Sequence, residues 1–237
     1  MLLFHHLPKT AGTSMHTMLG SVGWAEHADQ LIGDSDPNPE VVHSHRPYMQ
    51  LVKDCPGREN ITVLRDPVHR TFSYFRWLRS NNGNDALAAR KFSLVVKWID
   101  AIEQGSTGGQ PGFQSFCAEH ECSPLTSWYN IFNRMTIQLG STHLVGPRGS
   151  IEPNKFPPLE ECFERACGNI SSMYWFGFRE TLSSDVDRLS SMLGRPLTLP
   201  WANAAAEVSP PLNPKDIARI REINEWDIKL YEFAKSL

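Results

Sequence analysis

Features typical of membrane, secreted and nucleic-acid-binding proteins are scarce in this sequence. No run of about 18 apolar residues occurs, so no segment is predicted to span a membrane. The N-terminus lacks a basic segment followed by a long apolar run, which argues against a signal peptide and leads us to expect a cytoplasmic protein or a trimmed domain. The formal net charge of −3 argues against extended binding to nucleic acid. None of these features predicts an oligomeric state.

The cysteines are few and odd in number, five in 237 residues, which does not suggest a disulfide scaffold. Two pairs share a five-residue step, Cys117 with Cys122 and Cys162 with Cys167. Zinc sites usually use tighter pairs, so no metal is expected. Reduced thiols are the default interpretation, and a disulfide across one pair is the alternative.

Strand-like and helix-like segments alternate along the chain. Residues 1–6 and 60–64 are short apolar runs typical of buried strands, and a shorter extended piece surrounds residues 41–43. Later strands are predicted near 143–145 and 174–177, and Gly105 to Gly112 is a candidate surface loop. Helices are predicted after Gly12, after Pro67, at 88–104, 124–139, 159–167 and 181–193, and as one amphipathic helix after Pro214. This order predicts an α/β fold: a P-loop-type parallel sheet with helices on both faces, in a single domain of residues 1–237.

A candidate phosphate loop lies between the first strand and the first helix. It comprises Lys9, Thr10, Ala11, Gly12, Thr13 and Ser14. Backbone N–H groups and the positive end of the helix dipole converge there, Gly12 has no Cβ to block a ligand, and Lys9 adds a positive charge. Nucleotide kinases place the lysine after the glycine, whereas here it comes first, which disfavours an ATPase or GTPase. A capped helix without a ligand is the alternative.

A second candidate anion site follows the strand at residues 60–64. Arg65 ends that strand, where ligands of open α/β sheets bind, and Ser73 lies two turns into the next helix. Asp66 and Pro67 are a typical helix start, with a capping oxygen and a proline in the first turn. Arg70 has two interpretations, as a further phosphate ligand or as a partner of Asp66.

Together, Pro-Lys-Thr-x-Gly-Thr-Ser near the start and Arg-Asp-Pro-x-x-Arg-x-x-Ser-Tyr after a strand resemble the sulfotransferases that use 3′-phosphoadenosine-5′-phosphosulfate (PAPS). The likeness is greatest to the branch with heparan sulfate 2-O-sulfotransferase and related carbohydrate sulfotransferases. The resemblance implies that residues 9–14 bind the 5′-phosphosulfate and that Arg65 and Ser73 bind the 3′-phosphate. It also implies a carbohydrate hydroxyl as acceptor. Trp77, Trp128 and Tyr129 are candidates for stacking on sugar rings, and a place in the core is the alternative for each of them.

One departure from the family lies in a middle helix. Relatives carry a Thr-Arg-x-Leu-x-Gly run where this chain has Thr136-Ile137-Gln138-Leu139-Gly140. The missing arginine puts a substrate or nucleotide contact from this helix in doubt, and Arg134 is the nearest possible substitute.

Two histidines between the anion motifs are the candidate general base. His43 and His45 project from the same face if the chain is extended, since side chains alternate along a strand. A neutral histidine suits removal of a proton from an attacking alcohol. We assign His45 as the base and His43 as its partner or alternative, with Lys9 stabilising the leaving phosphate and no metal required. His5 and His6 are weaker candidates because they lie within the predicted first strand.

The predicted function is therefore in-line transfer of a sulfuryl group from PAPS to a hydroxyl. Two alternatives stay open: an ATP-dependent small-molecule kinase, and a module on the same fold that binds nucleotide or glycan without catalysis.

Overall fold

The computed structural model describes residues 1–22, 25–27, 40–81, 132–142, 145–146, 150–151, 158–200 and 214–237, and all structural statements below concern these ranges. The predicted helix at 88–104, the glycine-rich loop at 105–112, and Trp128 and Tyr129 lie outside them.

The centre of the structure is a parallel sheet with the strand order β2-β3-β1-β4-β7. Every pairing in it is parallel; Leu2 of β1, for example, is aligned with Val41 of β3 and with Glu59 of β4. Its strands are β1 (Leu2–His5), β2 (Ala25–His27), β3 (Val41–Ser44), β4 (Glu59–Leu64) and β7 (Trp175–Phe178). Two further strands, β5 (Val145–Gly146) and β6 (Ser150–Ile151), form a separate antiparallel pair.

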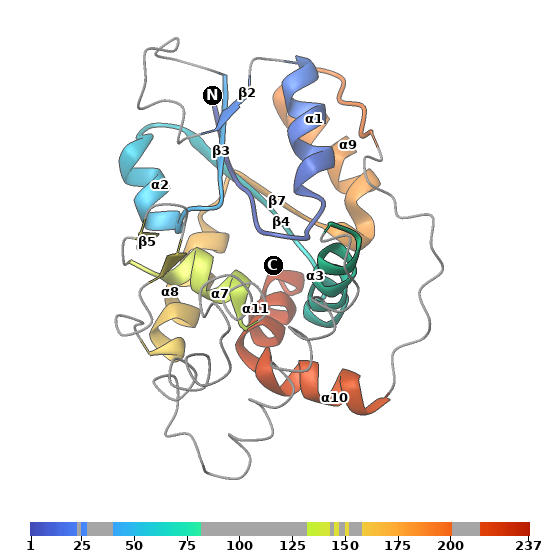
Figure 1. Ribbon diagram of the computed structural model, residues 1–237. Helices are drawn as coiled ribbons and strands as arrows, with labels where there is room; N and C mark the ends of the chain where they lie inside the picture. The colour runs from blue at the N-terminus through green and yellow to red at the C-terminus, as the bar shows by residue number, and fades with distance from the viewer. Residues whose placement is uncertain are drawn as a thin grey trace.

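The helices cover both faces of this sheet (Figure 1). They are α1 (Gly12–Val22), α2 (Tyr48–Asp54), α3 (Pro67–Asn81), α7 (Arg134–Gly140), α8 (Leu159–Ser171), α9 (Leu182–Leu193), α10 (Pro214–Ile223) and α11 (Glu225–Lys235), with a short 3₁₀ turn η2 (Arg179–Thr181) before α9. No helix among the ranges described above is long and apolar enough to cross a membrane.

Alternating side chains of the strands form a core on each face. Leu2 and Phe4 of β1 pack with α1 and α9, whereas Leu3 between them packs with α2. The first core includes Met15, Met18, Leu19, Ile61, Val63, Trp175, Val186 and Leu189. On the opposite face a third cluster joins α2, α7, α8 and α11 through Tyr48, Leu64, Met135, Leu139, Ala166, Ile170, Leu230 and Tyr231. Strands buried on both faces require near-continuous apolar sequence, which is what these segments have. The predicted α/β fold with helices on both faces is confirmed.

The order in which strands are added to the sheet reverses beside β1. After β1 the chain runs to β2 and β3 on one side, then crosses to β4 and β7 on the other. In open α/β sheets such a point, outside the carboxyl ends of the strands, is where ligands bind. The residues after β1, β3 and β4 meet there, and they include the two anion motifs and the histidine pair.

Several sequence-based boundaries need correction. The final helix is two helices, α10 and α11, divided at Asn224, whose buried side chain accepts a hydrogen bond from the Asn133 amide and donates to the carbonyl of Ile220. The helix expected at 124–139 begins at Arg134 in the described part of the chain, and Val145 pairs with β6 rather than joining the parallel sheet. Cys162 and Cys167 are free thiols, so no disulfide joins that pair.

Candidate active site

The loop after β1 combines left-handed backbone with the start of α1. Lys9 and Ala11 have φ angles of 67° and 72°, which side-chain-bearing residues rarely adopt. Left-handed residues between right-handed ones turn successive N–H groups toward one concave side, as in anion-binding loops. The hydroxyl of Thr10 donates a 2.9 Å hydrogen bond to the Leu7 carbonyl, so this hydroxyl stabilises the loop itself. Ser14 is buried and Thr13 is exposed on α1.

Arg65 connects the two anion motifs. It follows β4, the neighbour of β1, and its Nη1 donates a 2.9 Å hydrogen bond to the Lys9 carbonyl. Its Nε is buried and has no hydrogen-bond partner among the residues described. Burial, with Arg179 nearby, lowers the pKa of Arg65 to about 10, so the guanidinium stays charged at neutral pH. A partly buried cation with an unused N–H donor fits an anionic ligand group.

Lys9 lies partly buried beside Arg65. Burial and the charge of Arg65 lower the pKa of Lys9 to about 8. Its ammonium lies 5.4 Å from the ring centroid of Trp77, which is 44% exposed on α3 and stacks on Tyr74. Two cations held close together in a partly dry site are costly unless an anion compensates them. The pair therefore favours a doubly negative ligand at this loop.

The start of α3 follows the sequence-based prediction. The carboxylate of Asp66 accepts a 2.9 Å hydrogen bond from the His69 amide, and Pro67 is the first helical residue. The Asp66 amide in turn donates to Glu180 after β7, whose other oxygen accepts from the Tyr231 hydroxyl. These contacts hold the start of α3, which carries Ser73 half-buried two turns further on.

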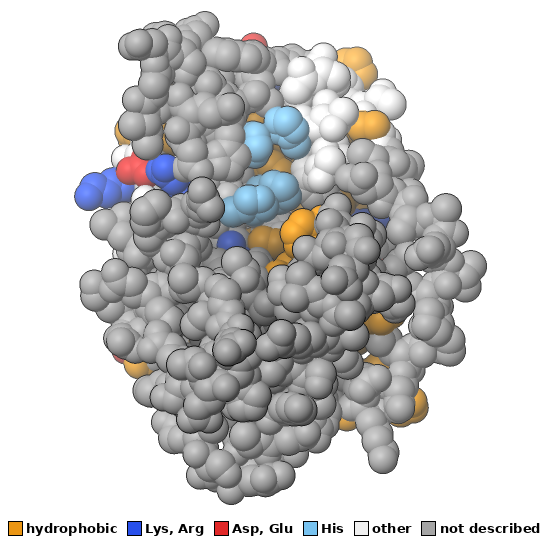
Figure 2. All heavy atoms as spheres, viewed as in Figure 1, with side chains coloured by type: hydrophobic (Ala, Val, Ile, Leu, Met, Phe, Trp, Pro, Cys, Tyr) orange, Lys and Arg blue, Asp and Glu red, His pale blue; other side chains and the backbone are white. Residues whose placement is uncertain are grey.

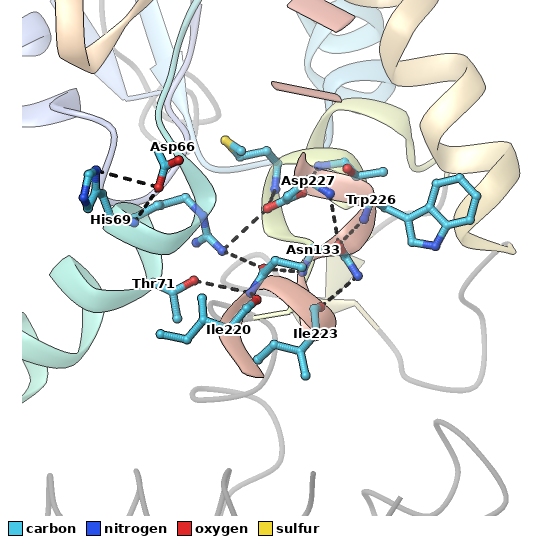
Figure 3. A network of polar contacts seen from close by, with 12 residues as sticks. Asp66, His69, Thr71, Asn133, Ile220, Ile223, Trp226 and Asp227 are labelled. Carbon is cyan, nitrogen blue, oxygen red and sulfur yellow. Dashed lines mark hydrogen bonds and ion pairs between the residues drawn. The ribbon is translucent and has the colours of Figure 1, made fainter. Parts of the chain in front are cut away.

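The side chain of Arg70 pairs with a carboxylate of α11. Its guanidinium is fully buried and lies 3.6 Å from the carboxylate of Asp227 in α11. This ion pair gives Arg70 a structural contact that neither sequence-based interpretation included. Figure 3 shows this ion pair within a polar network that joins α3, α10, α11 and the start of α7 through Thr71, Asn133 and Asn224.

The two candidate base residues lie at the end of β3 on the same side. His43 is in β3 and His45 directly follows it, both half-buried, while Val42 and Ser44 beside them are buried. Histidine side chains gather in one exposed hollow of the surface, beside hydrophobic ones (Figure 2). The ring of His43 lies 4.2 Å from that of His16 in α1, whereas the ring of His45 lies 4.1 Å from that of His6.

His6 lies closer to the candidate base histidines than its predicted place inside the first strand implied. β1 ends at His5, so His6 lies just beyond the strand, between the phosphate loop and His45. A Cβ placed on Gly12 would come within 1.6 Å of the His6 Nε2. The space that glycine leaves at this position is therefore occupied by the imidazole of His6. The sequence signal for this position is that His6 stands three residues before Lys9, and thus at the strand end rather than inside the strand.

His5, a weaker candidate in the sequence analysis, lies within β1. It is fully buried, its Nε2 bonds the Asn60 side chain at 2.8 Å, and its ring stacks on Tyr48. Burial lowers the pKa of His5 to about 4, so this side chain is neutral at physiological pH.

The helix α7 contributes two side chains beside the histidines: Gln138, which the sequence analysis did not single out, and Arg134, which it named as a possible substitute for the missing family arginine. Gln138 donates a 3.1 Å hydrogen bond from Nε2 to the His6 carbonyl, and Arg134 donates a 3.2 Å hydrogen bond from Nη2 to the His45 carbonyl. The helix that departs from the family pattern therefore contacts the main-chain carbonyls of two histidines. Among the described residues, no group of three or more His, Cys, Asp or Glu side chains is arranged to hold a metal ion.

Comparisons with known proteins bear on the family of the chain. No family model matches the chain. Heparan-sulfate 6-O-sulfotransferase 2 of Danio rerio is 31% identical over 185 residues, which cover 75% of this chain and 37% of that protein. The chain thus spans well under half the length of this relative. The similarity supports a sulfotransferase family for the chain.

Proposed function

We propose that this chain is a sulfotransferase that moves the sulfuryl group of PAPS to a hydroxyl, on a carbohydrate acceptor, and that residues 1–237 contain one such domain. The observation that carries the proposal is the convergence of three features at the carboxyl ends of neighbouring strands. They are the loop with Lys9 after β1, Arg65 after β4, and the histidine pair at the end of β3. The similarity to a heparan-sulfate sulfotransferase supports the same reaction class.

The donor is held at two points in this proposal. The loop amides of residues 9–14 and the Lys9 ammonium bind the 5′-phosphosulfate, since left-handed backbone and the α1 N-terminus direct N–H groups to one side. Arg65 and Ser73 bind the 3′-phosphate, and the buried Nε of Arg65 is a donor suited to that contact. No Mg²⁺ is needed for this scheme, because the charges on the donor are met by fixed cations and amides.

His45 is the proposed base. Its Nδ1 lies 2.7 Å from the His6 carbonyl, which only accepts hydrogen bonds, so Nδ1 carries the proton. In the neutral ring the lone pair then resides on Nε2, the atom that takes the acceptor proton. His43, two residues earlier, is the alternative base within the same mechanism.

The reaction is a single in-line displacement. The acceptor oxygen forms a bond to sulfur, the bond between sulfur and the bridging phosphate oxygen breaks, and the hydroxyl proton moves to His45 Nε2. The leaving group is 3′-phosphoadenosine-5′-phosphate (PAP), whose new negative charge is stabilised by Lys9 and the loop amides. Atoms and charge balance without a further reactant, and the imidazolium returns its proton to solvent.

The acceptor class is supported by the relative and by one exposed aromatic ring. Trp77 presents its ring beside Lys9, where an aromatic face can stack on a sugar. The sequence resemblance favours the 2-O branch, whereas the relative found by comparison carries the name of a 6-O-sulfotransferase. We propose a heparan-sulfate-type glycan as acceptor and leave the sulfated position to product analysis.

The deciding experiment is a transfer assay with radiolabelled donors. Purified protein is incubated with ³⁵S-labelled PAPS and desulfated heparan glycan without divalent metal, and in parallel with γ-³²P-labelled ATP and Mg²⁺. Label in the glycan only with PAPS is expected, and disaccharide analysis then identifies the oxygen modified. Transfer from ATP would identify a kinase. Tight PAP binding without any transfer would identify a non-catalytic module.

A further inference from the structure

The carbonyl of His6 accepts two hydrogen bonds, from side chains in different parts of the fold. It accepts from the Nδ1–H of His45 at 2.7 Å and from the Nε2 of Gln138 at 3.1 Å. The carbonyl of His45 itself accepts from the Nη2 of Arg134 at 3.2 Å. The main chain of His45 is thus hydrogen-bonded directly to α7. Its side chain is linked to α7 through the His6 carbonyl.

Arg134 and Gln138 are suited to this contact by their spacing and burial. They are four residues apart, so they lie one above the other on one face of α7. Gln138 is completely buried and Arg134 is 2% exposed. A buried donor that loses its acceptor is left desolvated without a partner, so these contacts resist movement of the carbonyls.

The position of α7 is in turn held by α11. The carboxylate of Asp227 accepts hydrogen bonds from the amides of Met135 and Thr136 at 3.2 Å and 2.8 Å. The side chain of Asn133 accepts from the amides of Trp226 and Asp227, both at 3.0 Å (Figure 3). The start of α7 therefore cannot shift without breaking several buried hydrogen bonds.

We propose that Arg134 and Gln138 are positioning residues that hold His45 in one orientation and in the Nδ1–H tautomer. The proposal rests on the histidine-base function given above. Gln138 shares the acceptor of His45 and so fixes that carbonyl in space, while Arg134 fixes the peptide that carries the ring. With Nδ1 held as donor, Nε2 is the nitrogen left to accept a proton from the sugar hydroxyl.

The test reads the tautomer of His45 directly. Protein labelled with ¹⁵N-histidine is measured by two-bond ¹H–¹⁵N correlation NMR, with the His45 signal assigned from the His45→Gln variant. The parent is expected to give the Nδ1–H pattern. Gln138→Met removes the amide donor with little change in volume, and Arg134→Met removes the guanidinium. Each should convert His45 to a mixture of tautomers and lower kcat by about 10–100-fold, the usual loss on removing a group that orients a functional histidine.

The controls separate positioning from general stability. Asn169→Leu removes a 2.7 Å hydrogen bond to the Leu139 carbonyl, also in α7 but without contact to His45. It should lower the Tm while leaving the tautomer and kcat unchanged. Arg134→Lys keeps a donor and the charge, and should recover part of the kcat lost in Arg134→Met. If Arg134→Met does not fold, the tautomer and kcat of Gln138→Met and Arg134→Lys still test the positioning role.

Two outcomes would overturn the inference. One is a parent His45 that is not in the Nδ1–H tautomer. The other is an unchanged tautomer and kcat in Gln138→Met and Arg134→Met. A failure of the proposed function looks different, because a parent that transfers no sulfuryl group from PAPS still yields the tautomer measurement.

Discussion

Arg65 donates a 2.9 Å hydrogen bond to the main-chain carbonyl of Lys9 and so joins two motifs that are 56 residues apart in the sequence. The contact brings two cations to the same end of the sheet, next to the start of α1. It also explains why the pKa of Lys9 is lowered to about 8, since burial and the neighbouring charge both disfavour its ammonium. A ligand with negative charge at both ends of a nucleoside would relieve this repulsion.

The first prediction concerns the 3′-phosphate. Arg65→Ala should weaken binding of PAP by about 2–4 kcal/mol, because a charge-assisted contact in a partly buried site is lost. Binding of 5′-AMP, which lacks the 3′-phosphate, should change far less. Isothermal calorimetry with both nucleotides measures the difference.

A matched arginine variant controls for the loss of charge. Arg195 pairs with Glu40, which precedes β3 and therefore lies at the opposite end of the strand from His45. Arg195→Ala should leave the affinity for both nucleotides unchanged. Equal losses for PAP and AMP in Arg65→Ala would show that Arg65 acts only by holding the Lys9 carbonyl.

The second prediction is a bell-shaped pH dependence of kcat/KM for PAPS. The rate should rise with pH as the base histidine loses its proton, and fall again as free-enzyme Lys9 loses its proton near its pKa of about 8. Lys9→Arg should move the falling limb to higher pH, because a guanidinium stays charged there. Lys9→Ala should lower kcat by about 10² or more, the usual cost of losing one electrostatic stabiliser. A falling limb that Lys9→Arg does not move would exclude Lys9 as its source.

The third prediction tests the packing of His6 on the phosphate loop. Gly12→Ala places a methyl group within 1.6 Å of the His6 Nε2, so the ring or the loop must move. We expect a loss of stability of about 1–3 kcal/mol, as for other overpacked positions, together with weaker PAP binding. Thermal unfolding with and without PAP measures both effects.

Gly168 in α8 is the control for this substitution, since a Cβ there meets nothing within 4 Å. Gly168→Ala should raise stability by about 0.5–1 kcal/mol, the ordinary gain in a helix interior. Normal stability and normal PAP binding in Gly12→Ala would show that His6 moves aside without consequence.

The fourth prediction concerns Asp227, which is buried and accepts hydrogen bonds from the first turn of α7. Burial raises the pKa of Asp227, while Arg70 and the amides of Thr136 and Met135 oppose this shift. Asp227→Ala should lower the free energy of unfolding by about 3–5 kcal/mol, because it leaves Arg70 buried without its carboxylate and removes the acceptor for both amides. Urea denaturation measures the loss.

Asp187→Ala, at an exposed position of α9, should change stability by no more than about 0.5 kcal/mol. Similar small effects in both variants would refute a structural role for the network in Figure 3.

Local sequence was sufficient to predict the fold class and the strands and loop that carry the two anion motifs. Apolar runs in β1 and β4, the Asp66-Pro67 helix start and the loop at residues 9–14 depend on propensities and caps within a few residues of each other. Such signals remain readable in one sequence because each is satisfied by its own neighbourhood. They placed both anion motifs and the histidine pair at the ends of strands.

Tertiary structure alone decided which side chains meet. Nothing local distinguishes Arg70, which is paired with Asp227, from an arginine that faces a ligand. The contacts of Gln138 with His6 and of Arg134 with His45 span 132 and 89 residues. Their partners are main-chain carbonyls, which every residue has, so no pattern of residue types marks them. The packing of α7 against the strand ends, held by α11, creates these contacts, and only the folded chain brings the donors within reach.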